Sequence, residues 1–511
     1  MNLVKSIATV GNYTILSRIV GFFRDKLMAM YIGPGPVMDA LSVAIKIPSF
    51  FRRLFAEGAF NAAFIPLFSS VLTNGGKKEA RTYAEEIMAW LITLIIIVIV
   101  IFEIFMPTIM QYLAYGFRST PDRMELAITL TRITMPYLLL ISLTALYGGI
   151  LNSLDKFVSA ASSPAAGNTF LVLAIFTCRH SIAEGASIAW IILISGTIQL
   201  LWVLIPASKE GLSLRPLLPR ITPQVKTFFK KMIPGAIGSG VVQINLFIGT
   251  LIASFLPVGG ISYLYFADRL NQLPLSVIGT AVSTALLPLM SRQIKEGNIS
   301  GALHNQNRSL EYALLLVLPA SIALFIAALP FVRIVFEGDK FGINESLQTA
   351  RTLQAFSFGL PAYILIKIFS TTFFARKEMK TPVVVASFCV IVDIILSILL
   401  LKPLAYVGIA LATAASAWIN AIVLGVILKK QNFLKFDKKI RHFFPRCLLA
   451  AIIMGVAVFY TSLLVEPFLC TSIFWKFLIF CFLVGVGLVV FFGTIFLSKA
   501  VDFKEMWKKT F

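Results

Sequence analysis

The residues of this sequence that could do chemistry are charges embedded in apolar surroundings. The stretch from Ser17 to Pro66 has the apolar background of membrane helices, yet it carries Arg18, Arg24, Asp25, Lys26, Asp39, Lys46, Arg52, Arg53 and Glu57. A charge at membrane depth costs roughly 2.5–3.5 kcal/mol on insertion scales, so it normally faces a protein interior or a watery cavity. Most of these charges are positive, and the planar guanidinium group suits phosphate. The stretch therefore predicts a cavity that handles an anionic, phosphorylated substrate.

Four of these cations are the candidates for anion binding: Arg18, Arg24, Lys46 and Arg52. They recur across two predicted helices within one short stretch, which interfacial anchoring alone explains poorly. Arg53 is adjacent to Arg52 and diverges from it by about 100° around a helix, so it can reach the membrane surface instead.

The acidic residues of this stretch have several possible roles. Asp25 follows Arg24 directly and can neutralise it. Asp39 and Glu57 lie near the two ends of the second predicted span. Each can pair with an arginine, cap a helix or move with a gate, and the sequence leaves these alternatives open.

Further charges interrupt later apolar runs. Arg269 follows Asp268 in YLYFADRLNQLP, as a self-satisfied pair or as positive charge supplied by a second lobe. Asp393 lies in the middle of FCVIVDIILSI. It suggests a proton or cation site shared with Asn245 or Gln243, and the alternative is a protonated carboxyl bonded to a hydroxyl. Two other isolated charges have no assigned role, namely Lys367 and Glu103.

The composition identifies the class of protein. The chain has 511 residues, of which 58% are hydrophobic and 14% are charged, whereas soluble domains have about 25% charged residues. This predicts an all-α polytopic membrane protein. The net charge of +21 does not indicate nucleic-acid binding, because the basic residues lie between apolar spans, where membrane topology and anionic lipid explain them.

Catalysis and metal binding are not expected. The five cysteines are scattered without a CxxC spacing, and the three histidines lie far apart in polar connections, so neither a metal site nor a catalytic dyad is indicated. An enzyme acting on lipid phosphates would need a positioned acid, base or metal cluster. We expect no catalytic residue, no metal and no bound cofactor.

Apolar runs of about 20 residues predict about fourteen transmembrane helices. The predicted spans are 5–31, 37–71, 84–112, 127–152, 159–178, 186–206, 233–256, 261–290, 311–336, 350–374, 382–401, 405–428, 444–465 and 473–497. Lys and Arg are strongly concentrated in the loops on the side that holds the N-terminus. By the positive-inside rule, both termini are cytoplasmic and the number of spans is even.

Weak internal similarity suggests a duplication, as in many transporters. AFIPLFSS near Pro66 resembles ALLPLMSR near Pro288, and both LNSLDKFVSAASSP and FFARKEMKTP are charged links that end in proline. We therefore expect two six-helix lobes plus two C-terminal helices. The predicted parts are an N-terminal lobe (1–208), a basic cytoplasmic linker (209–232), a C-terminal lobe (233–430) and the last two helices with the tail (431–511).

Several segments resemble one known family. SRIVGFFRD and DALSVAIKIPSFFRRLFAEGAFNAAFIP resemble the signature of the MurJ/MviN family, and so do LYGGILNSLDKF, YFADRLNQLP and ARKEMKTP. The family comprises proposed lipid II flippases of bacterial peptidoglycan synthesis. It belongs to a larger superfamily that includes multidrug and polysaccharide-lipid exporters. The resemblance covers essentially the whole chain.

The resemblance implies a two-lobed bundle of fourteen helices around a cationic cavity. It implies alternating access that moves lipid II, an undecaprenyl-diphosphate-linked disaccharide-pentapeptide, from the cytoplasmic to the periplasmic leaflet of the inner membrane. The cavity arginines of the family fall on Arg18, Arg24, Arg52 and Arg269, and its acidic position in the second span falls on Asp39. The last two helices are expected to offer a groove for the lipid tail.

Some questions stay open after the resemblance is considered. Membrane potential is a plausible driver, and a coupling cation near Asp393 is an alternative that cannot be matched residue by residue. A flippase or exporter of the same fold for another polyprenyl-linked saccharide or a drug is the rival function. We expect contacts with membrane lipids and lipid II, a monomeric state and no nucleic-acid partner.

Overall fold

The computed structural model describes residues 3–55, 59–465, 467 and 473–498. Every regular element in these ranges is a helix, and the extended pairing there is a single bridge between Gly338 and Phe341. The predicted all-α polytopic class is confirmed. Residue contacts divide the chain into two compact units, Met1–Ser262 (unit 1) and Tyr263–Phe511 (unit 2).

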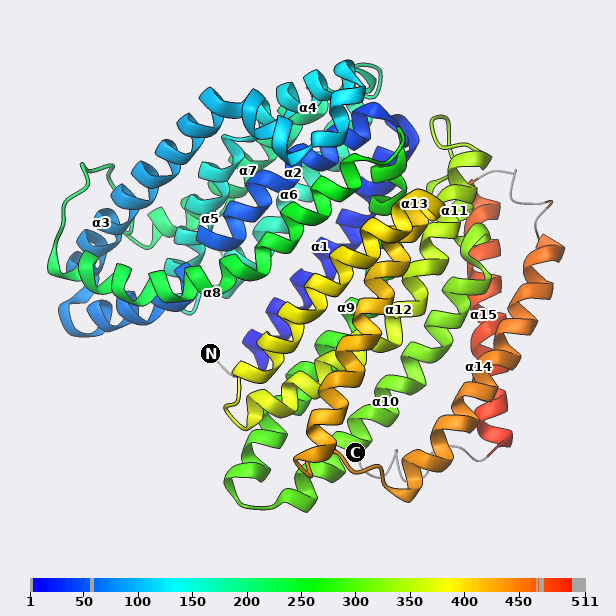
Figure 1. Ribbon diagram of the computed structural model, residues 1–511. Coiled ribbons are helices and arrows are strands. Elements are labelled where there is room, and N and C mark those ends of the chain that lie inside the picture. The colour runs from blue at the N-terminus through cyan, green and yellow to red at the C-terminus, as the bar shows by residue number, and fades with distance from the viewer. Residues whose placement is uncertain (1–2, 56–58, 466, 468–472, 499–511) are drawn as a thin grey trace. The chain divides into compact units, whose positions relative to one another are not determined.

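Unit 1 is built from the first eight long helices and two short 3₁₀ turns (Figure 1). Its elements are α1 (Leu3–Tyr31), α2 (Pro36–Phe55), α3 (Ala59–Leu113), η1 (Tyr115–Ser119), α4 (Pro121–Thr134), α5 (Tyr137–Ser153), α6 (Phe157–Thr177), η2 (Ile182–Glu184), α7 (Ala186–Lys209) and α8 (Pro223–Ser254). The most extensive packing joins α1 to α6, α6 and α5 to α7, α2 to α4, and α3 to α8. The charged stretch on α1 and α2 therefore packs against helices that follow much later in the sequence, namely α6 and α4.

Unit 2 holds most of α9 and the helices that follow it. They are α9 (Gly260–Lys295), α10 (Ile299–Ile326), α11 (Ala328–Phe336), α12 (Ile343–Ala375), α13 (Lys380–Lys430), α14 (Lys438–Val465) and α15 (Ile473–Leu497). In Figure 1, α14 and α15 (orange and red) lie side by side, and α14 also packs on α10. One large apolar core joins residues of α9, α10, α12 and α14.

Two long helices are broken by residues with positive φ. Helix α3 changes direction at Gly76 (φ 73°, ψ −175°) and α13 at Ala405 (φ 49°, ψ −126°). Gly76 lies between the predicted spans 37–71 and 84–112, and Ala405 is the first residue of the predicted span 405–428, so each long element runs from one predicted span into the next. Nine helices of the described ranges are long and apolar enough to cross a membrane by length and composition. The total of fourteen spans stays a prediction.

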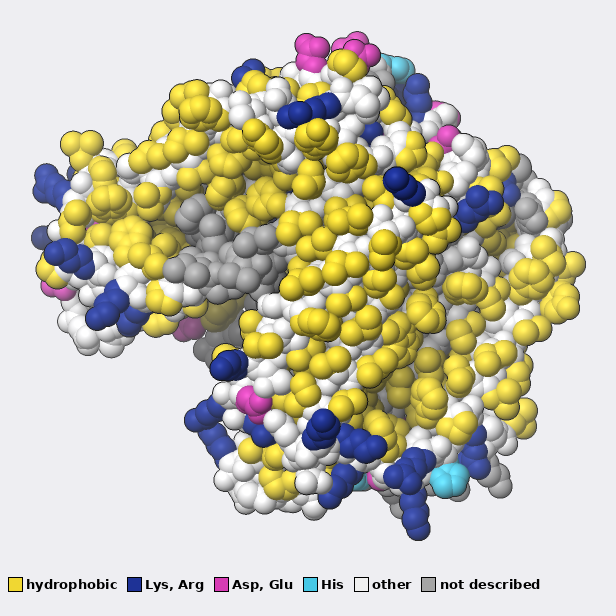
Figure 2. Space-filling model, in the orientation of Figure 1, with side chains coloured by type: hydrophobic (Ala, Val, Ile, Leu, Met, Phe, Trp, Pro, Cys, Tyr) yellow, Lys and Arg dark blue, Asp and Glu magenta, His cyan; other side chains and the backbone are white. Residues whose placement is uncertain are grey.

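The surface of the described residues suits a lipid environment. Many large apolar side chains are exposed, and hydrophobic side chains dominate the face shown in Figure 2. Lys and Arg gather at the end of unit 2 where α10 and α14 begin. There the connections are tied together, because Asn307 Nδ2 donates to the Lys435 carbonyl at 2.8 Å and Arg376 donates to Gln431.

The boundary between units differs from the predicted boundary between lobes. The prediction places the division in the basic linker 209–232, whereas the contacts place it between Ser262 and Tyr263. The reason is that α8 packs against α3 and α2, so it groups with the preceding helices. The predicted lobes and the groove beside the last two helices stay predictions.

Candidate functional site

The guanidinium of Arg24 is held in a polar cluster between α1 and α6. Its Nε and Nη2 donate to Asp25 Oδ1 at 3.0 and 2.7 Å, and its Nη1 donates to Asn168 Oδ1 at 3.0 Å. Asn168 also donates to the backbone carbonyl and the hydroxyl of Ser17, both at 3.3 Å. The Asp25 carboxylate therefore neutralises Arg24, as one of the sequence alternatives predicted.

The local sequence explains this cluster. Ser17, Gly21 and Arg24 recur at helical spacing, so they share the face of α1 that meets α6. A Cβ at Gly21 would lie 3.4 Å from Asn168 Nδ2, so this glycine leaves room for the amide. The Arg24 side chain keeps 23% of its surface exposed, whereas the Asp25 side chain keeps 5%. Arg24 is thus oriented by its neighbours yet still accessible to an anion.

The other candidate cations of unit 1 differ in exposure. Arg18 is exposed on α1, about 120° around the helix from Arg24. Lys46 and Arg52 are half-buried on α2. Glu57 lies outside the described residues. The structure thus supplies a detailed environment for Arg24, and anion binding by Arg18, Lys46 and Arg52 stays a prediction.

Asp39 is fully buried and accepts several hydrogen bonds at the beginning of α9. Its Oδ2 accepts from the Gly259 N–H at 2.7 Å, and its Oδ1 accepts from the Ser262 N–H at 2.8 Å and the Ser262 hydroxyl at 2.6 Å. Free N–H groups and the partial positive charge at a helix N-terminus favour a carboxylate at this place. Asp39 therefore caps α9 from another helix.

Arg123 forms an ion pair with Asp39 at the same place. Its Nη2 lies 2.7 Å from Asp39 Oδ2, its Nη1 donates to the Leu256 carbonyl at 3.1 Å, and its guanidinium lies over the Phe117 ring, 3.9 Å from the ring centre. Arg123 is only 3% exposed. It connects α4 and η1 with α2 and with the turn before α9. The gating role of Asp39 stays a prediction, while its ion pairing is a feature of the structure.

Sequence reasoning missed two residues of these clusters. Asn168 stands among the small residues of SSPAAGNTF, and Arg123 lies between the predicted spans 84–112 and 127–152. An isolated amide in a helix of small residues was a usable signal for Asn168. Nothing in the local sequence distinguishes Arg123, which is buried, from Arg118, which is exposed.

In unit 2, Asp268 and Arg269 make separate local contacts. The Arg269 guanidinium lies over the Tyr265 ring, 4.5 Å from its centre, and Gln272 donates to Asp268. Tyr265 and Gln272 stand one helical turn from these residues on α9. The contacts orient both charges, and substrate binding by Arg269 stays a prediction.

Asp393 lies in the first half of α13. Its side chain is half-buried, and the Thr413 hydroxyl in the second half of the same element donates to the Ile409 carbonyl at 3.0 Å. Asn245 belongs to unit 1 and Asp393 belongs to unit 2. An ion site at Asp393 and Asn245 stays a prediction.

The unassigned charges also have neighbours. Glu103 Oε2 lies 3.8 Å from Arg132 Nε, which makes a loose ion pair between α3 and α4. Lys367 lies against Gly279, where a Cβ would come within 2.4 Å of Nζ. Neither observation assigns a function to these residues.

Comparison with known proteins identifies the family. The family model described as lipid II flippase MurJ matches residues 28–479. The chain belongs to this family. A probable lipid II flippase MurJ of Rhizobium tropici is 38% identical over 509 residues, which are 98% of this chain and 95% of the relative. The corresponding protein of Rickettsia prowazekii (strain Madrid E) is 35% identical over 513 residues, which cover 99% of this chain and 100% of the relative.

Solved structures agree with the family assignment. A lipid II flippase MurJ in an inward closed conformation has a TM-score of 0.79 and 27% identity, covering 96% of this chain and 99% of that chain. An inward-facing multidrug transporter of the MATE family has a TM-score of 0.66 at 16% identity, covering 82% and 94%. The second similarity shows a shared fold alone. MurJ proteins are multi-pass membrane transporters, and the chain is therefore classed with transporters and not with enzymes.

Proposed function

We propose that this protein flips lipid II from the cytoplasmic to the periplasmic leaflet of the bacterial inner membrane by alternating access. The match to the MurJ family over residues 28–479 carries this conclusion. The polar cluster around Arg24 adds a physical reason, because a pre-oriented and accessible guanidinium suits a diphosphate. The rival function is export of another polyprenyl-linked saccharide or a drug. This rival is supported by the fold that the chain shares with the inward-facing multidrug transporter of the MATE family, at 16% identity.

In the proposed mechanism, the lipid diphosphate binds Arg18, Arg24, Lys46 and Arg52, and Arg269 contributes charge from the second unit. Charge-assisted, bidentate hydrogen bonds replace the lost hydration of the phosphates. At Arg24 the substrate competes with Asp25, whose carboxylate occupies the guanidinium in its absence. The undecaprenyl chain stays in lipid, because moving it through a polar cavity would expose apolar surface to water.

We further propose that both termini are cytoplasmic, that the protein acts as a monomer and that the membrane potential drives its reset. An inside-negative potential favours return of cationic groups towards the cytoplasm by about 2.3 kcal/mol per charge per 100 mV. A coupling cation bound near Asp393 and Asn245 is the alternative source of energy. The molar mass of the purified protein, measured by light scattering, tests the proposed monomeric state. The mass of a dimer would contradict it.

A leaflet-resolved lipid II translocation assay tests the function. We expect Arg24→Ala and Arg52→Ala to abolish translocation and growth complementation while the protein still inserts, because the diphosphate loses charge-assisted bonds. Arg53→Ala, next to Arg52 but exposed, is the matched control. Normal growth of cells that depend on Arg24→Ala would refute the role of this arginine. Collapse of the membrane potential should stop translocation. If translocation stopped only when Na⁺ was removed, a coupling cation would be favoured as the source of energy.

A further inference from the structure

Helix α10 carries a glutamate that is buried beside the beginning of α14. Glu311 Oε2 accepts a hydrogen bond from Arg308 Nη1, and the Nη2 of the same guanidinium donates to Asp437 Oδ2. Asp437 also caps α14, because its Oδ1 accepts from the Ile440 N–H at 2.8 Å. The Glu311 side chain is 8% exposed, whereas that of Asp437 is 35% exposed. One arginine is therefore shared by two carboxyl groups, of which Glu311 is the more deeply buried.

Asn307 lies one helical turn before Glu311, on the same face of α10. It is 3% exposed, and its Nδ2 donates to the Lys435 carbonyl at 2.8 Å. Reversal of the amide would place Oδ1 against that carbonyl, so this contact fixes which atom is the oxygen. Asn307 Oδ1 and Glu311 Oε1 are both buried, and neither meets a hydrogen-bond donor in the described part of the chain. Two buried acceptor oxygens on one helix face thus need a donor.

A single proton supplies what both oxygens need. A protonated carboxyl group has an O–H donor, and side chains four positions apart on a helix are close enough to form a hydrogen bond. The charges favour the same state, because two carboxyl groups that share a site resist being ionised together. Arg308 then keeps Asp437 as its ionised partner. Among the described residues, the remaining charged group that faces Glu311 is Lys439, which is exposed and therefore screened by water.

We propose that Glu311 is a proton-binding site that fastens the beginning of α14 to α10. The proton on Oε1 is donated to Asn307 Oδ1, while Arg308 and the Lys435 carbonyl hold the other ends of the two side chains. Loss of the proton leaves a buried carboxylate facing an amide oxygen, which weakens the attachment. The helices affected are α14 and the α15 that packs on it. The site does not include the Arg24 cluster, so it is independent of lipid II binding.

The test is the thermal unfolding midpoint of the purified full chain in detergent, measured from about pH 5.5 to about pH 8.5. The folded protein holds a proton that a glutamate of the unfolded chain has released, so unfolding releases this proton and stability falls as the pH rises. Glu311→Gln places a permanent N–H donor at the same position. We expect this variant to match the wild type at the lowest pH and to unfold about 3 °C above it at the highest pH. Comparison of the two proteins at each pH cancels the titration of all other groups.

Two further variants test the sharing of Arg308 and provide a control. Asp437→Asn keeps a good cap for α14 but removes the second negative charge, so Glu311 should ionise, and stability should begin to fall, at a lower pH than in the wild type. Glu296→Gln, just after α9, removes a glutamate paired with Arg292 where the two side chains are 51% and 80% exposed. We expect this control to show the pH dependence of the wild type.

Infrared spectroscopy at neutral pH observes the proton directly, because a protonated carboxyl group has a carbonyl band that a carboxylate lacks. We expect this band to be weaker in Glu311→Gln than in the wild type. The competing explanation is an ionised Glu311 bridged to Asn307 by a buried water, and Glu311→Gln would then lower the midpoint at every pH because Arg308 loses an anionic partner. That result would overturn the proposed proton site. An infrared band that Glu311→Gln leaves unchanged would overturn it as well.

Discussion

Burial separates two kinds of arginine in this protein. Arg24 is fixed by Asp25 and Asn168 but keeps 23% of its side chain exposed, whereas Arg123 is 3% exposed and paired with a fully buried Asp39. An accessible, oriented guanidinium can exchange one anionic partner for another. An enclosed guanidinium stabilises the structure around its partner, because removal of either charge leaves the other one buried and uncompensated.

The Asp39–Arg123 pair gives a prediction on stability. Arg123→Met keeps an apolar stem on Phe117 but leaves the Asp39 carboxylate without its counter-charge. We expect a loss of about 3 kcal/mol in the free energy of unfolding. Adding Asp39→Asn should recover part of this loss, since the buried charge is then gone. Thermal unfolding of the two single variants and the double variant measures these changes in stability. If the loss in the double variant equalled the sum of the two single losses, Asp39 and Arg123 would not be directly coupled.

Breaks within the long helices show how single residues set the course of an element. Gly76 has φ 73° and ψ −175°, a conformation that is essentially confined to glycine, and nothing lies within 4 Å of a Cβ built there. Ala405 adopts φ 49°, where a side chain is also unfavourable. The first position uses the residue type that the backbone requires, and the second carries local strain.

These two positions predict opposite effects of substitution. Gly76→Ala should lower stability by about 1–3 kcal/mol through backbone strain, since no side chain would clash. Ala405→Gly should raise stability by about 1 kcal/mol, because the strain of a Cβ at positive φ is removed. Gly249→Ala is the control, since it lies inside α8 with open space around it. Equal unfolding midpoints for Gly76→Ala and Gly249→Ala would rule out the backbone explanation.

Across the whole molecule, charge is distributed unevenly between the ends of unit 2. Lys429, Lys430, Lys438 and Lys439 are exposed where α13 ends and α14 begins, and Asn307 and Gln431 tie the neighbouring connections to this end. The connection between α11 and α12 instead carries Glu337 and Asp339, and Glu345 lies in the first turn of α12. Retention of basic loops in the cytoplasm is the physical basis of the proposed orientation.

Cysteine labelling tests this orientation. In a background without the native cysteines, Lys430→Cys places a single thiol at the exposed end of α13, and Lys340→Cys places one at an exposed position between α11 and α12. A membrane-impermeant maleimide added to intact spheroplasts should label Lys340→Cys at once and Lys430→Cys only after permeabilisation. The reverse pattern would invert the proposed topology. Labelling after permeabilisation controls for the reactivity of each thiol.

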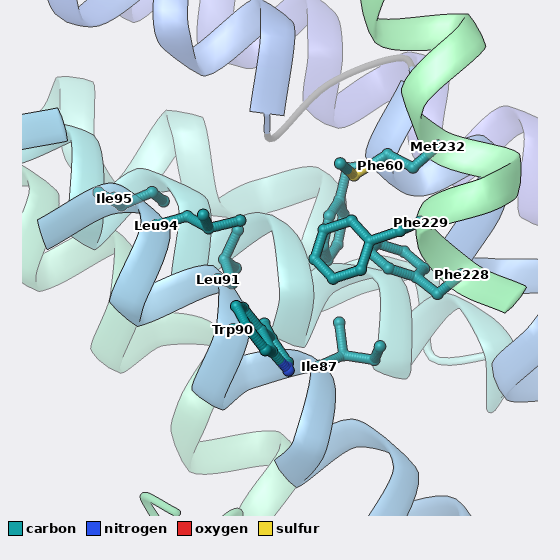
Figure 3. Close-up of a pocket in the computed structure, with 9 residues that line it drawn as sticks. All are labelled: Phe60, Ile87, Trp90, Leu91, Leu94, Ile95, Phe228, Phe229 and Met232. Carbon is teal, nitrogen blue, oxygen red and sulfur yellow. The ribbon is translucent and has the colours of Figure 1, made fainter. Parts of the chain in front are cut away.

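The sequence by itself determined the membrane class, the helical fold and the family, because apolar runs, charge bias and local motifs are properties of neighbouring residues. Only the tertiary structure decided the partners of those charges. Asn168 approaches Arg24 from a helix 144 positions away in sequence, and Arg123, Gly259 and Ser262 meet Asp39 from separate elements. The same applies to α8, whose packing on α3 placed it in unit 1 and formed a small apolar pocket between these two helices (Figure 3). Such contacts depend on how helix faces pack against each other, and that information is not contained in the spacing of residues along one helix.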